Sequence, residues 1–503
     1  MMSKASVIFS AGYLSQSLQA EFGNIPPVGL PYLNQVLLAA QLKSLPMQPC
    51  FVVLAKDMFI SGSLKKCIER LGINILYGKA DCSLVDNMTE TLARLNFNYF
   101  DILLGDTLIT NYDYSFNSYS AHKANYNYEW TPSRKLGHVF SGQILGIKKF
   151  SFLQLLQDKK LMNKKFSADI LDKLEVNVSG NWIDFGHIHT LYNARRGQFE
   201  PRYFNDLNLQ EGIVTKKSGN VFKIKAEKEW FRSAPKRVLT NLPRFYDSES
   251  ESNYQLEYLE CYTLRELSLF ARLKDEDWKF IIEKFLNFLD DTQNIYRQSE
   301  CEFDFNSFIT NKNHERTLNS TVFPFNVDDE IFINKKNYGT IRNLIDNLNE
   351  SIFKENFNSN VSYMHGDLCF SNIFYDFRSR NLKFIDPRGH IGNIITQWGF
   401  IDYDIAKFAH SLCYRYDDII AGNFDGNIEH NRITTDIIFA DDVVTEYFWD
   451  LVEKKFGIPK KKIVILTSAL FISMIILHSD NFKRQIQFLA VAFMLMEDPK
   501  KCF

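Results

Sequence analysis

The sequence predicts two domains of different fold class: an α/β domain with a mainly parallel sheet, followed by an α+β domain. Three observations support this. The chain has 503 residues, too many for one ordinary hydrophobic core. Short apolar strands alternate with helical patterns from residue 4 to residue 104, as in α/β proteins. After residue 211, short strands cluster near 212–262 and 363–389, and helical patterns fill much of the remainder.

The composition is that of a globular protein without a general affinity for polyanions. Hydrophobic residues make up 45% and charged residues 23% of the chain, values typical of soluble domains. The net charge of −2 gives no general attraction to nucleic acid or to an anionic membrane. We therefore expect small molecules rather than nucleic acid as partners, and the sequence leaves the oligomeric state open.

The cysteines and the apolar runs predict a cytoplasmic protein. The eight cysteines form no CxxC pair and no metal-finger spacing, which favours reduced thiols. The first residues, MMSKASVIFSAG, contain too short an apolar run for a signal sequence. The most apolar run, Ile463–Leu477, is shorter than the roughly 20 residues that span a bilayer. We expect it to form a buried helix and no membrane span.

In the first half, strands and helices alternate along the chain. The expected strands are Lys4–Ala11, Cys50–Ala55, Ile73–Tyr77, Asp101–Leu104 and Val139–Ile147. The expected helices are Tyr32–Leu45, Ser63–Leu71 and Ser83–Leu95, and the segment Asn181–Arg196 ends the domain. The strand ending at Leu104 brings Gly105 and Asp106 to its carboxyl end, where open α/β sheets bind ligands.

Four segments of this half resemble the sugar-phosphate nucleotidyltransferases: IFSAGY, IPPVGLPYLNQVLLA, LLGDTLI and NWIDFGHIHTLYNARR. The resemblance covers roughly residues 4–196 and implies a Rossmann-like mixed sheet. It implies that the loop with Gly12 binds CTP or another nucleoside triphosphate. It also implies that Asp106 and Asp184 together hold the catalytic metal.

The nucleotide loop departs from that family's pattern. Leu14, Ser15, Gln16 and Ser17 stand where the family has a second glycine and an arginine, and Pro26-Pro27 replaces a lysine. The missing cations would stabilise the triphosphate and the leaving pyrophosphate. Two readings therefore stay open for this domain: nucleotidyl transfer, or binding of a nucleotide or sugar phosphate without turnover.

The second half is organised around Tyr363–Gly389, YMHGDLCFSNIFYDFRSRNLKFIDPRG, which reads as strand, tight loop, strand, turn and strand. His365 and Asp367 open the loop, Asn372 follows five positions after Asp367, and Asp386 nineteen after it. Carboxylate and amide oxygens suit Mg²⁺, and phosphoryl transfer needs such groups at strand ends. The alternative is a surface hairpin whose Asp, Asn and Gly residues only form turns.

This stretch resembles the aminoglycoside phosphotransferase and choline kinase family, with HGDxxxxN and then IDP in place of DFG. The resemblance implies a bilobal kinase fold that uses ATP and Mg²⁺. Asp367 would accept the proton of the substrate hydroxyl, His365 would brace the loop, and Asn372 and Asp386 would hold the metal. In the following DPRG…FIDYDIAKFAHSL segment, we expect Asp402 or Asp404 to anchor the catalytic loop or cap a helix.

The same resemblance places an ATP site on the smaller lobe. Gly212–Lys217 and Val221–Lys225 read as two strands around Ser218-Gly219-Asn220, a turn whose amides would approach phosphate, and a helix follows. Lys223 is the expected phosphate-contacting lysine and Glu227 its helix partner. The same segment offers the rivals Lys216, Lys217, Lys225 and Glu229. The backbone of Glu257–Leu259 would meet the adenine.

These assignments give domain boundaries: a nucleotidyltransferase-like domain at 1–197, a linker at 198–211, a smaller kinase lobe at 212–262 and a larger lobe at 263–503. Within the larger lobe, Ser299–Lys336 is rich in Asn and Phe, and we expect an irregular insertion there. Its last helices are expected at Asp441–Lys455, Lys462–His478 and Asn481–Met496.

The leading hypothesis is a kinase for a sugar, polyol or amino alcohol, fused to a nucleotidyltransferase-like domain that is either active or degenerate. A kinase yields a phosphomonoester, which a nucleotidyltransferase can activate, and fold analogy points to precursors of capsule or lipopolysaccharide. One alternative is an antibiotic phosphotransferase, whose polycationic substrate would favour an acidic cleft. Another is a non-catalytic scaffold that binds nucleotide or sugar phosphate. A protein kinase is disfavoured because no A-P-E segment follows Asp386.

Overall fold

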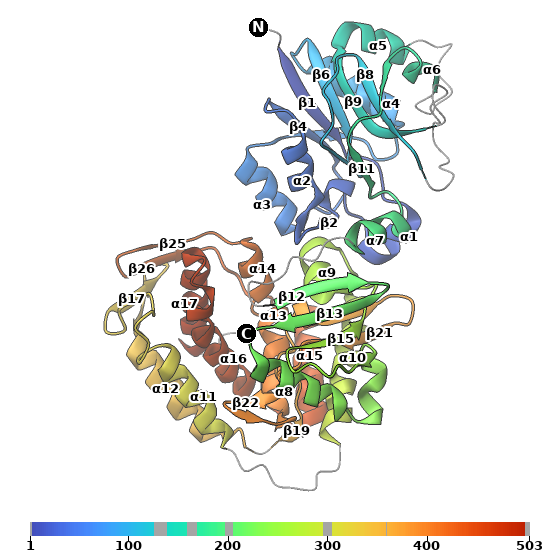
Figure 1. The fold of residues 1–503 in the computed structure, drawn as a ribbon. Coiled ribbons are helices and arrows are strands. Elements are labelled where there is room, and N and C mark those ends of the chain that lie inside the picture. The colour runs from blue at the N-terminus through green and yellow to red at the C-terminus, as the bar shows by residue number, and fades with distance from the viewer. Residues whose placement is uncertain are drawn as a thin grey trace. The chain divides into compact units, whose positions relative to one another are not determined.

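The computed structural model describes residues 3–124, 138–157, 168–196, 205–294, 304–358 and 360–497. The chain divides into two compact units (Figure 1). The first comprises Met1–Phe199 together with Leu267–Leu273, and the second comprises Glu200–Glu266 together with Lys274–Phe503.

The first unit is built on a seven-stranded mixed sheet with the strand order β10-β8-β9-β6-β1-β4-β5 (Figure 1). Strands β6, β1, β4 and β5 lie side by side in this order, with β5 at the edge, and run parallel. Strand β9 is antiparallel to both β6 and β8. This confirms the predicted mixed, partly parallel α/β fold. The sheet strands are β1 (Lys4–Phe9), β4 (Cys50–Ala55), β5 (Asn74–Gly78), β6 (Tyr99–Leu104), β8 (Ser118–His122), β9 (Val139–Lys148) and β10 (Glu175–Asn177).

Helices and two small two-stranded sheets complete this unit. The helices are α1 (Gln16–Phe22), η1 (Pro27–Gly29), α2 (Leu37–Ser44), α3 (Gly62–Leu71), α4 (Leu84–Arg94), α5 (Lys149–Gln157), α6 (Ala168–Leu171) and α7 (Ile188–Arg196). One small sheet is the hairpin of β2 (Pro31–Tyr32) and β3 (Gln35–Val36), and the other pairs β7 (Thr107–Thr110) with the distant β11 (Asn181–Asp184). The helix expected from Tyr32 begins only at Leu37, because Leu33 and Asn34 take left-handed φ angles in the hairpin.

One face of the sheet packs against α4 and α5. Alternate residues of β1, such as Val7 and Phe9, are buried in one cluster with Met88 and Leu92 of α4 and Phe152 of α5. Each fully buried side chain of this kind contributes about 1.5–3 kcal/mol relative to exposure. The alternation of β1 and the 3–4 residue spacing in α4 therefore fix which sides of these elements meet.

The smaller lobe of the second unit is a four-stranded antiparallel sheet with one long helix. The strand order is β12-β13-β15-β14, comprising β12 (Asn205–Gln210), β13 (Ile213–Ser218), β15 (Asn253–Glu257) and β14 (Phe245–Tyr246). The helices are α8 (Val221–Arg232) and η2 (Lys236–Asn241). Part of the expected linker at 198–211 is therefore the edge strand β12, paired along its length with β13.

The second strand expected at Val221–Lys225 is wrong, because α8 begins there. The Asn220 side chain accepts a hydrogen bond from the Lys223 amide and caps the helix. Ile224, Glu227, Lys228 and Phe231 are buried at helical spacing, a period that a five-residue window does not reveal.

The larger lobe combines helices with short strand pairs. Its strands are β16 (Tyr262–Thr263), β17 (Glu330–Ile333), β18 (Lys336–Thr340), β19 (Val361–Tyr363), β20 (Ile373–Asp376), β21 (Asn381–Phe384), β22 (His390–Ile391), β23 (Ile394–Ile395), β24 (Trp398–Phe400), β25 (Gly426–Glu429) and β26 (Arg432–Thr435). Helix α9 (Leu264–Phe270) spans the boundary at Leu267 between the segments assigned to the two units. The other helices of the larger lobe are α10 (Asp275–Gln293), α11 (Phe305–Arg316), α12 (Ile341–Glu355), η3 (Phe370–Asn372), α13 (Ile401–Leu412), α14 (Tyr416–Ala421), α15 (Val443–Phe456), α16 (Lys460–Met474), η4 (Ile475–His478) and α17 (Phe482–Glu497).

Helix α11 lies where the sequence led us to expect an irregular insertion. Its sequence, FNSFITNKNHER, is rich in Asn, which has a low helix propensity. The Asp304 side chain accepts a hydrogen bond from the Asn306 amide at the helix start, and Phe305 and Ile309 are buried. Capping and tertiary packing therefore stabilise a helix that its local sequence does not favour.

Helix α16 and the η4 turn that follows form the one described stretch, Lys460–His478, that is long and apolar enough to cross a membrane. Buried side chains make up 72% of it, and α16 packs against α12, α13 and α17. It is a core helix of this lobe, as the sequence led us to expect.

Candidate active site

A buried carboxylate on α13 holds the loop that follows β19. Asp404 accepts hydrogen bonds from the amides of His365, at 2.9 Å, and Gly366, at 2.7 Å. Gly366 has φ +80°, a conformation that glycine adopts without strain. Of the two aspartates expected to anchor this loop, Asp404 does so, whereas Asp402 pairs with Lys462 at 2.9 Å.

Asp367 projects from this loop and stays ionised. Its Oδ1 lies 3.0 Å from the Lys407 ammonium, and its Oδ2 accepts a hydrogen bond from the Asn372 amide at 3.1 Å. Burial alone would raise the pKa of Asp367, but Lys407 and Arg388 hold it well below its usual range. An ionised carboxylate in this position can accept a hydrogen bond from a substrate hydroxyl.

His365 lies inside the loop rather than at its surface. Its ring is fully buried, and its Nδ1 accepts a hydrogen bond from the Asp367 amide at 3.3 Å. Burial lowers the pKa of His365 to about 4, so the ring is neutral near pH 7. These contacts suit the bracing role expected for this residue and do not suit proton transfer at neutral pH.

The β20–β21 hairpin brings Asn372 and Asp386 to the same end. Ile373 is paired with Phe384, and the Ile385 amide donates to the Asn372 carbonyl at 3.0 Å. Asp386 has φ +57°, which is uncommon for a residue with a side chain and is often found at functional sites. The oxygens of Asn372 and Asp386 are of the kind that binds Mg²⁺, so these two residues could hold the metal.

A lysine on β13, Lys216, is paired with Asp386. The Lys216 ammonium lies 2.7 Å from Glu227 Oε2 and 3.0 Å from Asp386 Oδ1, and its side chain is only 4% exposed. Burial alone would lower the pKa of Lys216, but Asp386 and Glu227 together raise it. Tyr254 also donates a hydrogen bond to Glu227, at 2.7 Å.

The expected pairing of Glu227 with a lysine is found, but the lysine differs. Lys223 lies on the first turn of α8, 44% exposed and 3.7 Å from Glu227 Oε1. Lys216, which the sequence offered as a rival, makes the close contacts with both carboxylates. Lys223, expected on a strand, lies on α8 and also lines the cleft that contains Asp386. Which of the two lysines contacts the ATP phosphates stays a prediction.

The segment expected to meet adenine lies at the end of β15. The Glu257 amide donates to the Arg244 carbonyl at 2.9 Å, and the Tyr258 amide donates to the Gly212 carbonyl at 2.8 Å. These two donors are used within the sheet. Of the backbone amides of Glu257–Leu259, the Leu259 amide is therefore the one that we still predict to contact adenine.

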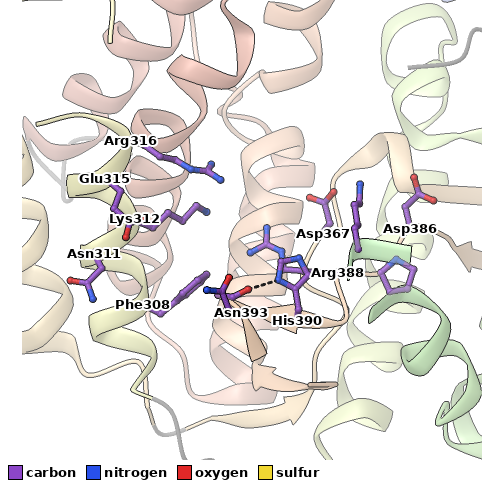
Figure 2. Close-up of a pocket in the computed structure, with 13 residues that line it drawn as sticks. Phe308, Asn311, Lys312, Glu315, Arg316, Asp367, Asp386, Arg388, His390 and Asn393 are labelled. Carbon is purple, nitrogen blue, oxygen red and sulfur yellow. Dashed lines mark hydrogen bonds between the residues drawn. The ribbon is translucent and has the colours of Figure 1, made fainter. Parts of the chain in front are cut away.

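Asp367 and Asp386 both line a cleft of about 620 Å³ within the second unit (Figure 2). Its opposite wall is α11, from which Lys312 and Arg316 extend toward the side that bears Asp367 and Arg388. Sequence reasoning missed these basic residues and Lys407. Arg388 and Lys407 lie in segments quoted above, IDPRG and FIDYDIAKFAHSL, whereas no local pattern pointed to α11.

In the first unit, the pairing of β7 with β11 brings the two expected aspartates together. Asp184 lies opposite Thr107, and the Phe185 amide donates to the Asp106 carbonyl at 2.8 Å. A Cβ on Gly186 would lie 2.7 Å from Asp106 Oδ2 and 3.2 Å from Asp184 Oδ1, so only glycine fits between the two carboxylates.

The environments of these two carboxylates differ. Burial and the neighbouring Asp184 raise the pKa of Asp106 to about 6. Asp184 accepts hydrogen bonds from the Gly186 amide and the Thr190 hydroxyl and contacts His187 Nδ1 at 2.7 Å. The part of the chain that the structure describes contains no group of three or more His, Cys, Asp or Glu side chains suited to a metal. A metal at either site would need additional ligands from nucleotide phosphates or water.

Gly12 follows β1 in an exposed loop. A Cβ there would meet no atom within 4 Å, so the space beside this loop is open. The neighbouring Tyr13 hydroxyl donates to Asp57 Oδ2 at 2.5 Å. This open loop lies where the sequence resemblance expects the nucleotide.

No family model and no curated protein matches the chain. Solved structures of two kinds are similar to it. The inositol-1-phosphate CTP transferase from T. maritima matches 38% of this chain, at the N-terminal end, and 91% of its own, with 13% identity and a TM-score of 0.29. A choline/ethanolamine kinase family protein from Mesorhizobium loti matches 62% of this chain and 96% of its own, with 10% identity and a TM-score of 0.36. The choline kinase from Cryptosporidium parvum Iowa II matches 60% and 88%, with 11% identity and a TM-score of 0.39.

Proposed function

We propose that the second unit is an ATP- and Mg²⁺-dependent kinase that phosphorylates a hydroxyl group of a small molecule. The observation that carries this proposal is that Asp367 and Asp386 line one cleft, while Asn372 is hydrogen-bonded to Asp367 and Lys216 is paired with Asp386. Phosphoryl transfer depends mainly on positioning and on charge neutralisation, and these residues offer both.

In this reaction, each residue has a separate task. Asp367 orients the acceptor hydroxyl and takes its proton, while the acceptor oxygen forms a bond to the γ-phosphorus of ATP. The bond from that phosphorus to the bridging oxygen breaks, and ADP leaves. Asn372 and Asp386 would hold Mg²⁺, which neutralises phosphate charge when bound. Lys216, fixed by Glu227 and Asp386, would contact the phosphates.

We propose that the first unit binds a nucleoside triphosphate at the Gly12 loop and a metal at Asp106 and Asp184. A phosphomonoester made by the kinase would be a chemically suitable substrate for nucleotidyl transfer, giving an activated precursor in the cytoplasm. A role in capsule or lipopolysaccharide synthesis rests on fold analogy. Binding without turnover is the second candidate, favoured by the missing cations in the nucleotide loop.

The kinase proposal is tested by measuring ADP formation with a panel of hydroxylated acceptors. Loss of the carboxylate in Asp367→Asn should lower kcat by about 10²–10⁴, as expected for a positioned general base. Asp376→Asn is the matched control, because Asp376 lies on the same hairpin and bonds only to turn residues, including Ser379. Equal rates for Asp367→Asn and the wild type would refute the assignment of the base.

A further inference from the structure

The wall of the cleft that faces Asp367 is basic. Lys312 and Arg316 lie one turn apart on α11, and Arg388 follows Asp386 on the other side. Figure 2 shows the side chains of Lys312 and Arg316 directed into the space between α11 and the catalytic loop. This is the part of the cleft that an acceptor must occupy if its hydroxyl is to reach Asp367.

These cations contact Tyr403 and a backbone carbonyl. Lys312 Nζ donates to the Tyr403 hydroxyl at 3.3 Å, and Arg316 donates to the Ser473 carbonyl at 3.0 Å. The Arg388 guanidinium lies 5.0 Å from the centre of the Tyr403 ring. Among the residues that the structure describes, no Asp or Glu oxygen forms a salt bridge with any of the three cations.

Cations packed together in this way repel one another. Burial, together with the neighbouring Arg388, Arg316 and Lys407, lowers the pKa of Lys312 to about 7, although Tyr403 opposes this shift. Glu315 is the acidic side chain that α11 contributes to the cleft, and it is exposed. Burial alone would lower the pKa of Arg388, but Tyr403, Asp367 and Asp404 raise it. A bound anion would add counter-charge beside Lys312 and Arg316, and a guanidinium pairs well with carboxylate or phosphate oxygens.

The same wall disfavours a cationic acceptor. An amino alcohol or a polycationic antibiotic would meet Lys312, Arg316 and Arg388 at short range. A quaternary ammonium group is best bound by an open aromatic face, and Arg388 lies over the ring of Tyr403. The described lining residues include the acidic Asp367, Asp386 and Glu315 and the basic Lys223, Lys312, Arg316 and Arg388, so the cleft is not predominantly acidic, as an antibiotic phosphotransferase would need.

We therefore infer that the acceptor is a hydroxylated oxyanion, whose anionic group is bound by Lys312, Arg316 and Arg388 while its hydroxyl faces Asp367. A hydroxy acid and a phosphorylated sugar or polyol share this chemistry. The inference rests on the proposed kinase function, and it specifies the charge of the substrate at the same site.

A matched set of acceptors tests the inference. Glucose, glucosamine, gluconate and glucose 6-phosphate carry similar hydroxyl groups and differ in charge. The anionic members should give the highest kcat/KM, and the comparison of gluconate with glucose 6-phosphate separates carboxylate from phosphate recognition. A preference for glucose or glucosamine would overturn the inference while leaving the kinase proposal intact.

Two variants show whether the basic wall is responsible. Lys312→Gln and Arg316→Gln should each raise KM for the anionic acceptor about 10- to 100-fold, as expected for loss of one charged hydrogen bond, with a smaller change in kcat. KM for ATP should not change. Lys354→Gln is the control, because Lys354 is an exposed lysine on the neighbouring helix α12. Unchanged acceptor KM in both variants would overturn the inference.

A binding measurement separates this inference from the kinase proposal. If no acceptor is phosphorylated, the kinase proposal fails, and gluconate and glucose 6-phosphate are titrated calorimetrically into the full chain. Binding that weakens in Lys312→Gln but not in Lys354→Gln would support an anion site. Absence of binding, or equal binding in both variants, would overturn it, with circular dichroism confirming that each variant is folded.

Discussion

At the residue scale, the site combines groups that the sequence reveals with groups that it hides. Asp367, Asn372 and Asp386 lie in one short stretch, so their spacing alone indicates a shared site. Lys216 could not be distinguished from its neighbours, because KKSGNVFKIK contains several lysines and the start of α8 decides which of them is buried. Lys312 approaches Asp367 only through the packing of α11, which no local pattern predicts.

The pKa shifts around Lys312 predict how acceptor binding depends on pH. Burial and neighbouring cations lower the pKa of Lys312 to about 7. Burial would raise the pKa of Tyr403, but Arg388, Lys312 and Lys407 lower it to about 7. As the pH rises through 7, Lys312 loses positive charge or Tyr403 gains negative charge, and both changes weaken the binding of an anion.

KM for a carboxylate acceptor such as gluconate should therefore rise between pH 6 and 9 at saturating ATP, by up to about tenfold per pH unit above 7. Burial lowers the pKa of His390 from its usual value, so its titration lies below the range above pH 7 in which KM should rise, and Arg316 and Arg388 stay charged. The pH dependence of KM should be weaker in Lys312→Gln. The Tyr403→Phe variant separates the contribution of the Tyr403 phenol from that of the Lys312 amine. A flat KM profile in the wild type would contradict the assignment.

At the scale of elements, the segment after Asp386 fixes the position of α8. Gly389 has φ +65°, and a Cβ there would lie 2.2 Å from the Ala226 carbonyl oxygen, in the helix that carries Glu227. Gly389→Ala should therefore displace α8, raise KM for ATP severalfold and destabilise the fold by about 1–3 kcal/mol. ATP kinetics and urea unfolding measure these two effects.

Gly392→Ala provides the control for this substitution. Gly392 also has a left-handed φ, +54°, but a Cβ there would meet no atom within 4 Å. In the Gly392→Ala variant, backbone strain should lower the free energy of unfolding by about 1–2 kcal/mol, and KM for ATP should not change. Equal KM values for both variants would show that contact between this segment and α8 does not position the ATP site.

The elements differ in how well the sequence predicted them. The alternation of β1, β4, β5 and β6 with α3 and α4 is strong and local, and the predicted strands and helices agree with the structure within a few residues. Helix α11 and the start of α8 were missed, because their stability comes from caps and tertiary packing. The wall of the cleft opposite Asp367 could therefore not be predicted.

At the scale of the whole molecule, we propose that the two units of one chain carry out two separate reactions. Asp106→Asn should abolish nucleotide-dependent pyrophosphate release without changing ADP formation, since Asp106 and Asp367 belong to different units. Asp367→Asn should have the opposite effect. Asp113→Asn, an exposed aspartate in the first unit, is the control. Pyrophosphate release that persists in Asp106→Asn would remove the metal assignment there.

The central claim is that Asp386 and its neighbours hold a divalent ion against ATP, and Mn²⁺ tests it most directly. Water-proton relaxation measures the binding of Mn²⁺–ATP to the full chain. Every protein used carries Asp106→Asn, which removes the metal site proposed in the first unit. A second substitution, Asp386→Asn, should weaken this binding by at least about tenfold. Asp376→Asn, introduced in the same background, should leave the binding unchanged. Undiminished Mn²⁺–ATP binding in the Asp386 variant would contradict the account.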